Sequence, residues 1–171
     1  MPKILLPYCP MCGQKKVINT ENQFKCDACQ YVYYHNPAPT VGAIIIKNHR
    51  VLLGKRAMEP MKGYWDVPGG FMDANETPKE TLKREMLEEL GIKIEIGKFV
   101  GYFPDVYGKF NESTLNLYYV VTKWSGEIKP DDDVTEAKWF NLNKLPEIAF
   151  KNGLEAIEKY KSSQLAKNGK K

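Results

Sequence analysis

The 171-residue chain lacks a long apolar run, and this absence excludes a helix that crosses a membrane. Its longest apolar run, Val41 to Ile46, is interrupted by Gly42, whereas a spanning helix needs about 20 apolar residues. We also expect no signal peptide, because the stretch over residues 1–7 is too short and is interrupted by proline. Without either feature, we expect the protein to be cytoplasmic.

Net charge is small, and positive charge is not concentrated in the centre of the chain. The formal net charge is +4, and the lysine excess lies in residues 1–35 and 151–171. Nucleic-acid binding through charge needs a larger and more clustered basic surface. We therefore expect no nucleic-acid partner. Hydrophobic residues make up 43% of the chain, which supports a packed core and excludes a disordered chain.

Cysteine is absent after residue 29, and the four cysteines form two C-x-x-C pairs. Cys9 pairs with Cys12 and Cys26 with Cys29, and such pairs fit one tetrahedral Zn²⁺ bound by four thiolates. Two disulfides are the first alternative, which a cytoplasmic location disfavours. A redox C-x-x-C is the second, but it does not explain two copies. We predict a structural zinc ribbon over residues 1–35, stabilised largely by its metal.

The rest of the chain alternates predicted strands with two predicted helices. The segment 36–40 is predicted to be a stiff linker, because each proline fixes φ. Hydrophobic patterning predicts strands over residues 40–47, 50–56, 92–102, 113–123 and 136–141, and helices over 77–90 and 152–161. This order predicts an α/β fold with a mixed sheet over residues 40–162. A flexible basic tail is expected over residues 163–171.

The predicted helix at 77–90 has clear boundary signals. Thr77 suits the N-cap, Pro78 the first turn and Glu80 a capping box, while Gly91 suits the C-terminal cap. A helical wheel separates an apolar arc from an acidic arc. The apolar arc contains Leu82, Met86, Leu87 and Leu90, and the acidic arc contains Glu85, Glu88 and Glu89.

Three carboxylates on one arc repel each other unless a cation lies between them. Mg²⁺ prefers oxygen ligands of this kind and accepts phosphate oxygens as well. A solvated glutamate-rich helix is the alternative when the helix is considered alone. The wider sequence favours function: Gly70, Glu76 and residues 84–92 match the pattern G-x5-E-x7-R-E-U-x-E-E-x-G-U at every fixed position, U being bulky and aliphatic.

This pattern resembles the Nudix box. The resemblance implies the Nudix α/β/α sandwich, and hydrolysis of a nucleoside diphosphate linked to another group with Mg²⁺ or Mn²⁺ as cofactor. Glu85, Glu88 and Glu89 would bind the metal, and the carbonyl of Gly69 would add a ligand.

The resemblance also assigns the catalytic roles around the metal. Arg84 would pair with Glu76 and with a metal-binding glutamate, holding the loop and the helix in shape. Glu88 or Glu89 would take a proton from the attacking water. Two acids outside the box are alternatives for this base, namely Glu112 and Glu136.

The predicted ribbon limits the choice of substrate class. A ribbon followed by a Nudix domain resembles NADH pyrophosphatases, which also cut NAD caps from RNA, and short proteins related to ADP-ribose/FAD pyrophosphatases. The first group carries S-Q-P-W-P-F-P-x-S after the box, whereas residues 100–107 here are V-G-Y-F-P-D-V-Y. We therefore favour ADP-ribose-like or FAD-like dinucleotides. The alternatives are an NADH or NAD-cap pyrophosphatase and a non-catalytic nucleotide sensor.

Aromatic residues are the candidates for binding the base of this nucleotide. We predict Trp65, Phe103 and Tyr107 as substrate-binding residues, with Tyr102 and Phe110 as further candidates. The segment 105–112 is predicted to be a mobile substrate loop. A chain of this size is compatible with a homodimer and with a monomer.

Overall fold

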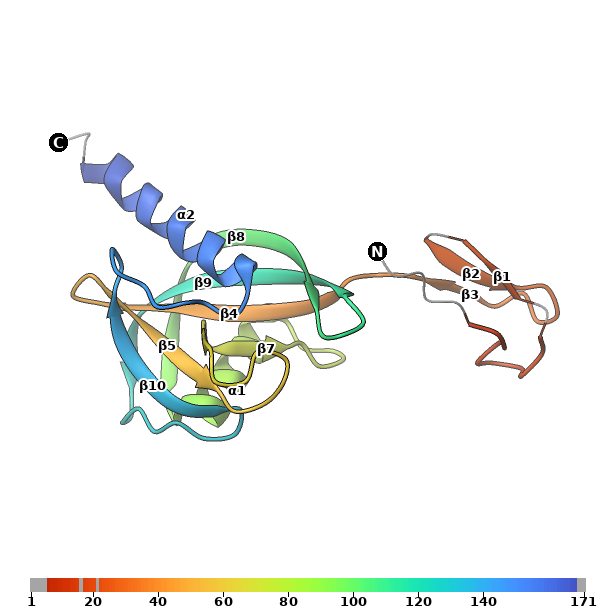
Figure 1. Cartoon of the computed structure of the whole chain (residues 1–171), viewed down its shortest axis with the longest axis horizontal. Coiled ribbons are helices and arrows are strands. Elements are labelled where there is room, and N and C mark those ends of the chain that lie inside the picture. The colour runs from red at the N-terminus through yellow and green to blue at the C-terminus, as the bar shows by residue number, and fades with distance from the viewer. Residues whose placement is uncertain (1–5, 16, 21, 169–171) are drawn as a thin grey trace.

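Figure 1 shows the computed structural model of the protein, which describes residues 6–15, 17–20 and 22–168. These residues form a small N-terminal sheet and a larger α/β unit, which lie apart and are joined through the start of strand β4 (Ala38–Lys47). The strand begins inside the predicted linker, because Ala38 and Pro39 already pair with the next strand of the large sheet. Within the described ranges, no helix is long and apolar enough to cross a membrane.

The N-terminal sheet has three short antiparallel strands in the order β1-β2-β3. They span Val17–Asn19, Gln23–Cys26 and Val32–Tyr34. The fully buried ring of Phe24 packs against Tyr31 and Tyr33, with ring centroids 5.7 Å apart in both pairs. One buried ring is a small core for a folded unit, so this sheet needs another source of stability.

The larger sheet is mixed, as predicted. Its main strands follow the order β10-β5-β4-β9-β8, and only β4 and β9 run parallel. Two short strands, β6 and β7, pair with β5 and β4. The bounds are β5 Arg50–Arg56, β6 Trp65–Asp66, β7 Gly69–Phe71, β8 Lys93–Tyr107, β9 Glu112–Ser125 and β10 Val134–Asn141.

The predicted substrate loop at 105–112 is the end of a hairpin. Strands β8 and β9 remain paired as far as Tyr107 and Glu112, and only the tight turn at 108–111 separates them. Gly108 has a φ of 69°, which the turn requires and which glycine adopts without strain.

Two helices cover opposite faces of the large sheet, giving the predicted α/β/α sandwich (Figure 1). Helix α1 (Pro78–Leu90) packs Leu82, Met86 and Leu90 against one face, and helix α2 (Lys151–Asn168) packs Ala156 and Ile157 against the other. Strand β4 serves both faces, because side chains alternate along a strand. The helix α2 continues to Asn168, so residues 163–168 of the predicted tail are helical, and residues 169–171 lie outside the described residues.

The ends of α1 have the predicted caps. The Thr77 hydroxyl accepts a hydrogen bond from the Glu80 backbone N–H, and the Glu80 carboxylate accepts one from the Thr77 backbone N–H at 2.9 Å. Gly91 ends the helix with a φ of 67°. One prediction on this helix is wrong: Leu87, placed on the apolar arc, is 52% exposed.

Candidate active site

The four cysteine sulfurs converge in the N-terminal unit. The Sγ atoms of Cys9 and Cys29 lie 3.7 Å apart, as do those of Cys12 and Cys26, and all four lie within 4.8 Å of one another. A disulfide would hold two sulfurs about 2.05 Å apart, so these cysteines are free thiols. Tetrahedral zinc with a Zn–S distance of about 2.3 Å separates its sulfurs by about 3.8 Å. The cluster is therefore consistent with the predicted zinc.

Both C-x-x-C turns close in the same way. Gly13 and Gln30 follow the two pairs with φ values of 70° and 62°, and their backbone N–H groups donate to the carbonyls of Cys9 and Cys26. Gln30 adopts the left-handed conformation although it is not glycine. Its side-chain amide donates to the Asp27 carbonyl at 2.9 Å, which stabilises that turn.

The three glutamates on the acidic arc of α1 make two kinds of contact, with Arg84 and with strand β7. Glu85 and Glu88 both accept hydrogen bonds from Nη1 of Arg84, at 2.8 and 2.9 Å. Glu89 turns toward strand β7, where its Oε2 accepts the backbone N–H of Gly69 at 2.9 Å. Glu89 is buried and Glu88 is half-exposed. The helix therefore directs Glu89 into the protein beside the Gly69–Gly70 segment.

Arg84 joins the helix to the preceding loop and to β7. Its Nε and Nη2 donate to the two carboxylate oxygens of Glu76 at 2.9 and 3.0 Å, and Nη2 also donates to the carbonyl of Phe71 at 3.1 Å. These hydrogen bonds, with one from Thr81, lower the pKa of Glu76 to about 2. A bidentate contact between a guanidinium and a carboxylate fixes the orientation of both groups as well as pairing their charges. Arg84 therefore positions β7 relative to the glutamates.

Burial disfavours the charged forms of two glutamates on α1, Glu89 and Glu85. Desolvation raises the pKa of Glu89 well above its ordinary value, and the negative charge of Glu85 raises it further, against the hydrogen bond from Gly69. Desolvation also raises the pKa of Glu85, although Arg84 opposes the shift. Buried like charges favour a bound cation, and carboxylate oxygens are ligands that Mg²⁺ prefers. The donor set therefore fits a divalent metal.

Two glycines allow β7 to approach the glutamates. A Cβ atom at Gly69 would lie 2.1 Å from the carbonyl oxygen of Val41, and Gly69 has a φ of 146°. A Cβ atom at Gly70 would lie 2.4 Å from Oε1 of Glu85. A larger residue at Gly69 would collide with the backbone of β4, and one at Gly70 would displace the Glu85 carboxylate.

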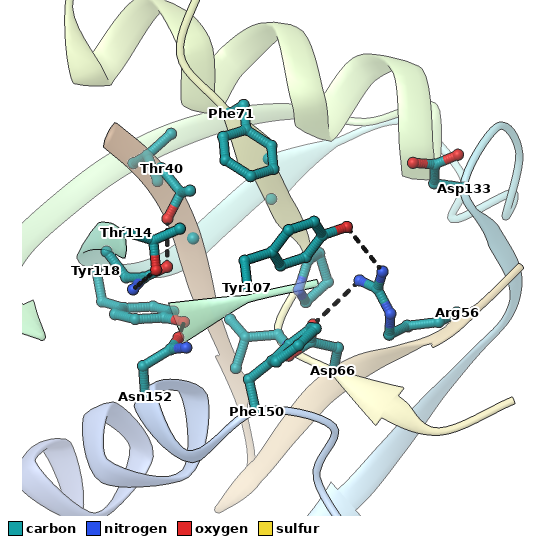
Figure 2. Close-up of a pocket in the computed structure, with 18 of the residues that line it drawn as sticks. Thr40, Arg56, Asp66, Phe71, Tyr107, Thr114, Tyr118, Asp133, Phe150 and Asn152 are labelled. Atoms are coloured by element: carbon teal, nitrogen blue, oxygen red, sulfur yellow. Dashed lines mark hydrogen bonds and ion pairs between the residues drawn. The ribbon is translucent and has the colours of Figure 1, made fainter. Parts of the chain in front are cut away.

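A cleft opens beside this cluster, between β7 and the start of α2 (Figure 2). Its walls come from β4, β5, β7, the hairpin of β8 and β9, and the first turn of α2. The polar, charged and aromatic lining residues are Thr40, Arg56, Asp66, Phe71, Glu89, Tyr107, Thr114, Asn116, Tyr118, Asp133, Phe150 and Asn152.

Tyr107 is the one predicted substrate-binding residue that lines this cleft. Its ring lies 5.2 Å from that of Phe71 and 5.5 Å from that of Phe150, measured between centroids. The other two predictions need correction. Trp65 packs edge-on against Phe140 at 4.7 Å, and the buried Phe103 packs against Tyr118. Both rings belong to the core under α2.

The remaining candidates also lie outside the cleft lining. Tyr102 and Phe110 are 67% and 64% exposed. Glu112 begins strand β9 at the hairpin turn and is exposed. Glu136 lies on β10, where its carboxylate is 3.9 Å from Nζ of Lys55. Neither acid is among the described residues that line the cleft, so a base from α1 stays the favoured prediction.

One end of the cleft is charged. Arg56 is the one basic residue among its described lining residues, and it donates to the Pro60 carbonyl at 2.8 Å and to the Tyr107 hydroxyl at 3.4 Å. Its guanidinium lies 5.0 Å from the ring centroid of Phe150 and 3.5 Å from Asp66. Burial raises the pKa of Asp66 to about 6, although Arg56 opposes the shift. Figure 2 shows Arg56 between Tyr107 and Asp66.

The opposite end carries neutral hydrogen-bonding groups. The Tyr118 hydroxyl donates to Oδ1 of Asn152, and the Thr40 hydroxyl donates to Oδ1 of Asn116 at 2.6 Å. Asn116 in turn donates to the Thr114 hydroxyl at 3.0 Å. Sequence reasoning missed these residues because they come from distant strands and from α2, and no local pattern joins them.

Comparison with known proteins identifies what this arrangement resembles. The chain matches the NUDIX domain over residues 36–160. It is 35% identical over 136 residues to an ADP-ribose pyrophosphatase of Methanocaldococcus jannaschii, covering 80% of this chain and 78% of that protein. It is 29% identical over 147 residues to the NAD-capped RNA hydrolase NudC of Vibrio parahaemolyticus, covering 84% of this chain and 54% of that protein. The chain thus spans about half the length of this second relative.

The fold has a solved counterpart of nearly the same extent. The crystal structure of a NUDIX hydrolase from Nitrosomonas europaea superposes with a TM-score of 0.72 at 27% identity, and the match covers 94% of this chain and 93% of that one.

Proposed function

Because the chain belongs to the Nudix family of hydrolases, we propose that it hydrolyses the pyrophosphate bond of ADP-ribose or a similar ADP-linked dinucleotide. The observation that carries this proposal is the glutamate cluster of α1, held beside Gly69 and Gly70 at the mouth of an aromatic-lined cleft. The 35% identity to an ADP-ribose pyrophosphatase, over most of both chains, favours ADP-ribose over other nucleotides. FAD is the next substrate of this class.

The metal site is proposed at the end of the cleft formed by α1 and β7. Glu85, Glu88 and Glu89, with the carbonyl of Gly69, would hold Mg²⁺ or Mn²⁺. When bound, the metal neutralises diphosphate charge and lowers the pKa of a bound water. Arg84 is a positioning residue, because it contacts Glu85 and Glu88 from one side and the Phe71 carbonyl from the other.

Glu89 is the favoured base of the two predicted glutamates. It lines the cleft, and burial raises its pKa well above the ordinary value of a glutamate, which favours acceptance of a proton. Glu88 is half-exposed, is hydrogen-bonded to Nη1 of Arg84 and does not line the cleft. Glu89 would remove a proton from the water whose oxygen attacks one phosphorus. The bond between that phosphorus and the bridging oxygen would break, and two monophosphates would be released.

The zinc is proposed to be structural. Cys9, Cys12, Cys26 and Cys29 supply four thiolates, which leave no open coordination position for substrate. The sulfurs belong to the N-terminal unit, which lies apart from the larger α/β unit (Figure 1).

One of the two other candidate functions has specific support. An NADH or NAD-cap pyrophosphatase is favoured by the similarity to NudC, although this chain spans only about half of that protein. A non-catalytic nucleotide sensor would use the same cleft, but such a protein has no need for the complete set of box glutamates present here.

A substrate panel separates these functions. Purified protein is incubated with ADP-ribose, FAD, NADH or a nucleoside triphosphate, with Mg²⁺ or with a chelator, and products are separated chromatographically. We expect the highest kcat/KM with ADP-ribose, giving AMP and ribose 5-phosphate only when Mg²⁺ is present. A higher kcat/KM with NADH would favour the second function. Binding without hydrolysis of any substrate would favour the sensor.

A further inference from the structure

The neutral end of the cleft contains a hydrogen-bond relay with a fixed direction. Asp105, on β8, accepts two hydrogen bonds at one carboxylate oxygen from Asn152: the side-chain Nδ2 at 2.7 Å and the backbone N–H at 3.2 Å. Asn152, the second residue of α2, accepts the hydroxyl proton of Tyr118 at Oδ1. Figure 2 shows Tyr118 and Asn152 on the side of the pocket away from Asp133.

The direction follows from the chemistry of the carboxylate. An ionised carboxylate only accepts hydrogen bonds, so the Asn152 amide must present its nitrogen to Asp105 and its oxygen to Tyr118. The Tyr118 hydroxyl therefore donates its proton to Oδ1 of Asn152 and is not available as a donor to a ligand. Burial and the charges of Asp66 and Asp105 raise the pKa of Tyr118 well above its ordinary value, so the phenol keeps this proton at neutral pH.

Two hydrogen-bonding positions on these lining residues have no partner among the described residues. Asn152 has a second Nδ2 hydrogen, for which no acceptor is found among the described residues, and Tyr118 has a free oxygen lone pair. Both side chains line the cleft, although each residue is less than a tenth exposed. A ligand that enters therefore meets one donor and one acceptor, and the hydrogen bonds that Asp105 accepts from Asn152 fix which is which.

We propose that Asn152 and Tyr118 are specificity-determining residues that bind an adenine base, and that Asp105 is the positioning residue that sets their polarity. Adenine offers a donor at N6 beside an acceptor at N7, which complements an acceptor at Tyr118 and a donor at Asn152. Hypoxanthine offers two acceptors on the same edge, one of which would face the Tyr118 oxygen unpaired. This inference rests on the proposed function for the substrate class, and it adds the choice of base.

Binding of AMP and IMP tests the proposal without hydrolysis. The dissociation constants of AMP, IMP and ribose 5-phosphate are measured by NMR titration with Mg²⁺ for the wild-type chain, Tyr118→Phe, Asp105→Asn and Tyr119→Phe. Tyr119 is the matched control, because it is the next residue on β9 and packs against Phe99 with the core on the α1 face.

We expect the wild-type chain and Tyr119→Phe to bind AMP about 5- to 100-fold more tightly than IMP, as one pair of base contacts allows. Tyr118→Phe and Asp105→Asn should bring this ratio close to one while leaving the affinity for ribose 5-phosphate, which has no base, unchanged. A merely structural role would weaken all three ligands together.

Two results would overturn the inference: a wild-type AMP to IMP preference below twofold, or variants that keep the wild-type ratio. Equal weakening of ribose 5-phosphate by both variants would also overturn it. The outcome is distinct from that of the substrate panel. An AMP preference without hydrolysis of any dinucleotide would leave the base site standing and remove the proposed hydrolysis, and the reverse result would do the opposite.

Discussion

The two units of this chain are stabilised in different ways. The N-terminal sheet buries the ring of Phe24 and the sulfurs of Cys9 and Cys26, whereas the Nudix domain has an apolar cluster on each face of its sheet. The small unit therefore has little apolar burial, and the proposed zinc would supply the stability that it lacks, whereas the large unit depends on apolar burial. Only the large unit has enough apolar burial to offset the destabilisation that buried like charges cause. Glu85 and Glu89, whose pKa values are raised, lie in that unit.

Removing zinc should have the largest effect, and should act on one unit alone. A structural zinc supplies about 10 kcal/mol or more of folding free energy to small units of this kind. We expect Cys26→Ser, or a strong chelator, to unfold residues 6–35 while the domain keeps its unfolding midpoint. Amide hydrogen exchange resolved by residue measures both. Joint loss of protection in both units would contradict this separation.

A cavity in the domain core should have the reverse effect. Leu82→Ala removes a fully buried side chain from α1 and should lower the free energy of unfolding of the domain by about 3 kcal/mol, without changing exchange in the ribbon. Leu87→Ala on the same helix is the control, because Leu87 is 52% exposed, and it should change stability by about 0.5 kcal/mol or less. Urea unfolding gives both values, and equal losses would refute the assigned core.

The domain should also lose stability as pH rises through the titration of Asp66. Its pKa is about 6 in the folded chain, above its ordinary value of 3.8, so the folded state holds a proton that the unfolded state has released. The free energy of unfolding should therefore fall between about pH 4 and pH 6, by about 3 kcal/mol at most from this group. Asp66→Asn should remove that part of the slope in urea unfolding series, and an unchanged slope would disprove the assignment.

The smallest effect is expected at the cap of α1. Thr77→Ala removes the hydroxyl that accepts the Glu80 N–H and should cost about 1 kcal/mol of domain stability. Thermal unfolding measures the change, with zinc present so that the ribbon stays folded. A loss as large as that of Leu82→Ala would mean that the cap has a tertiary role.

Local signals explain what could be predicted from the sequence. The caps of α1, the cysteine pairs and the acidic arc depend on residues close together in the sequence, so spacing located them, and the resemblance to the Nudix box gave the glutamates their role. Cleft residues depend on which distant strands meet. Thr40 meets Asn116 across β4 and β9, and Asp105 meets Asn152 across β8 and α2, through pairings that no local pattern encodes.

The aromatic residues show the same limit. Trp65, Phe103 and Tyr107 are all suited to stacking on a base, but strand position decides which of them reaches the cleft. Phe103 faces α2 and the core cluster around Tyr118, whereas Tyr107 lies at the open end of the same strand between Phe71 and Phe150. Aromatic character identifies the three candidates, and the position of each residue on its strand determines that only Tyr107 lines the cleft.

The most direct test of the central claim compares two glutamates. Glu89→Gln removes the buried carboxylate beside Gly69, and Glu95→Gln removes an exposed carboxylate on β8 that pairs with Lys123. Initial rates of Mg²⁺-dependent ADP-ribose hydrolysis are measured for both variants and the wild-type chain. We predict that Glu89→Gln loses about 100-fold or more in kcat while remaining folded, and that Glu95→Gln keeps the wild-type rate. A folded Glu89→Gln variant with the wild-type rate would contradict the account.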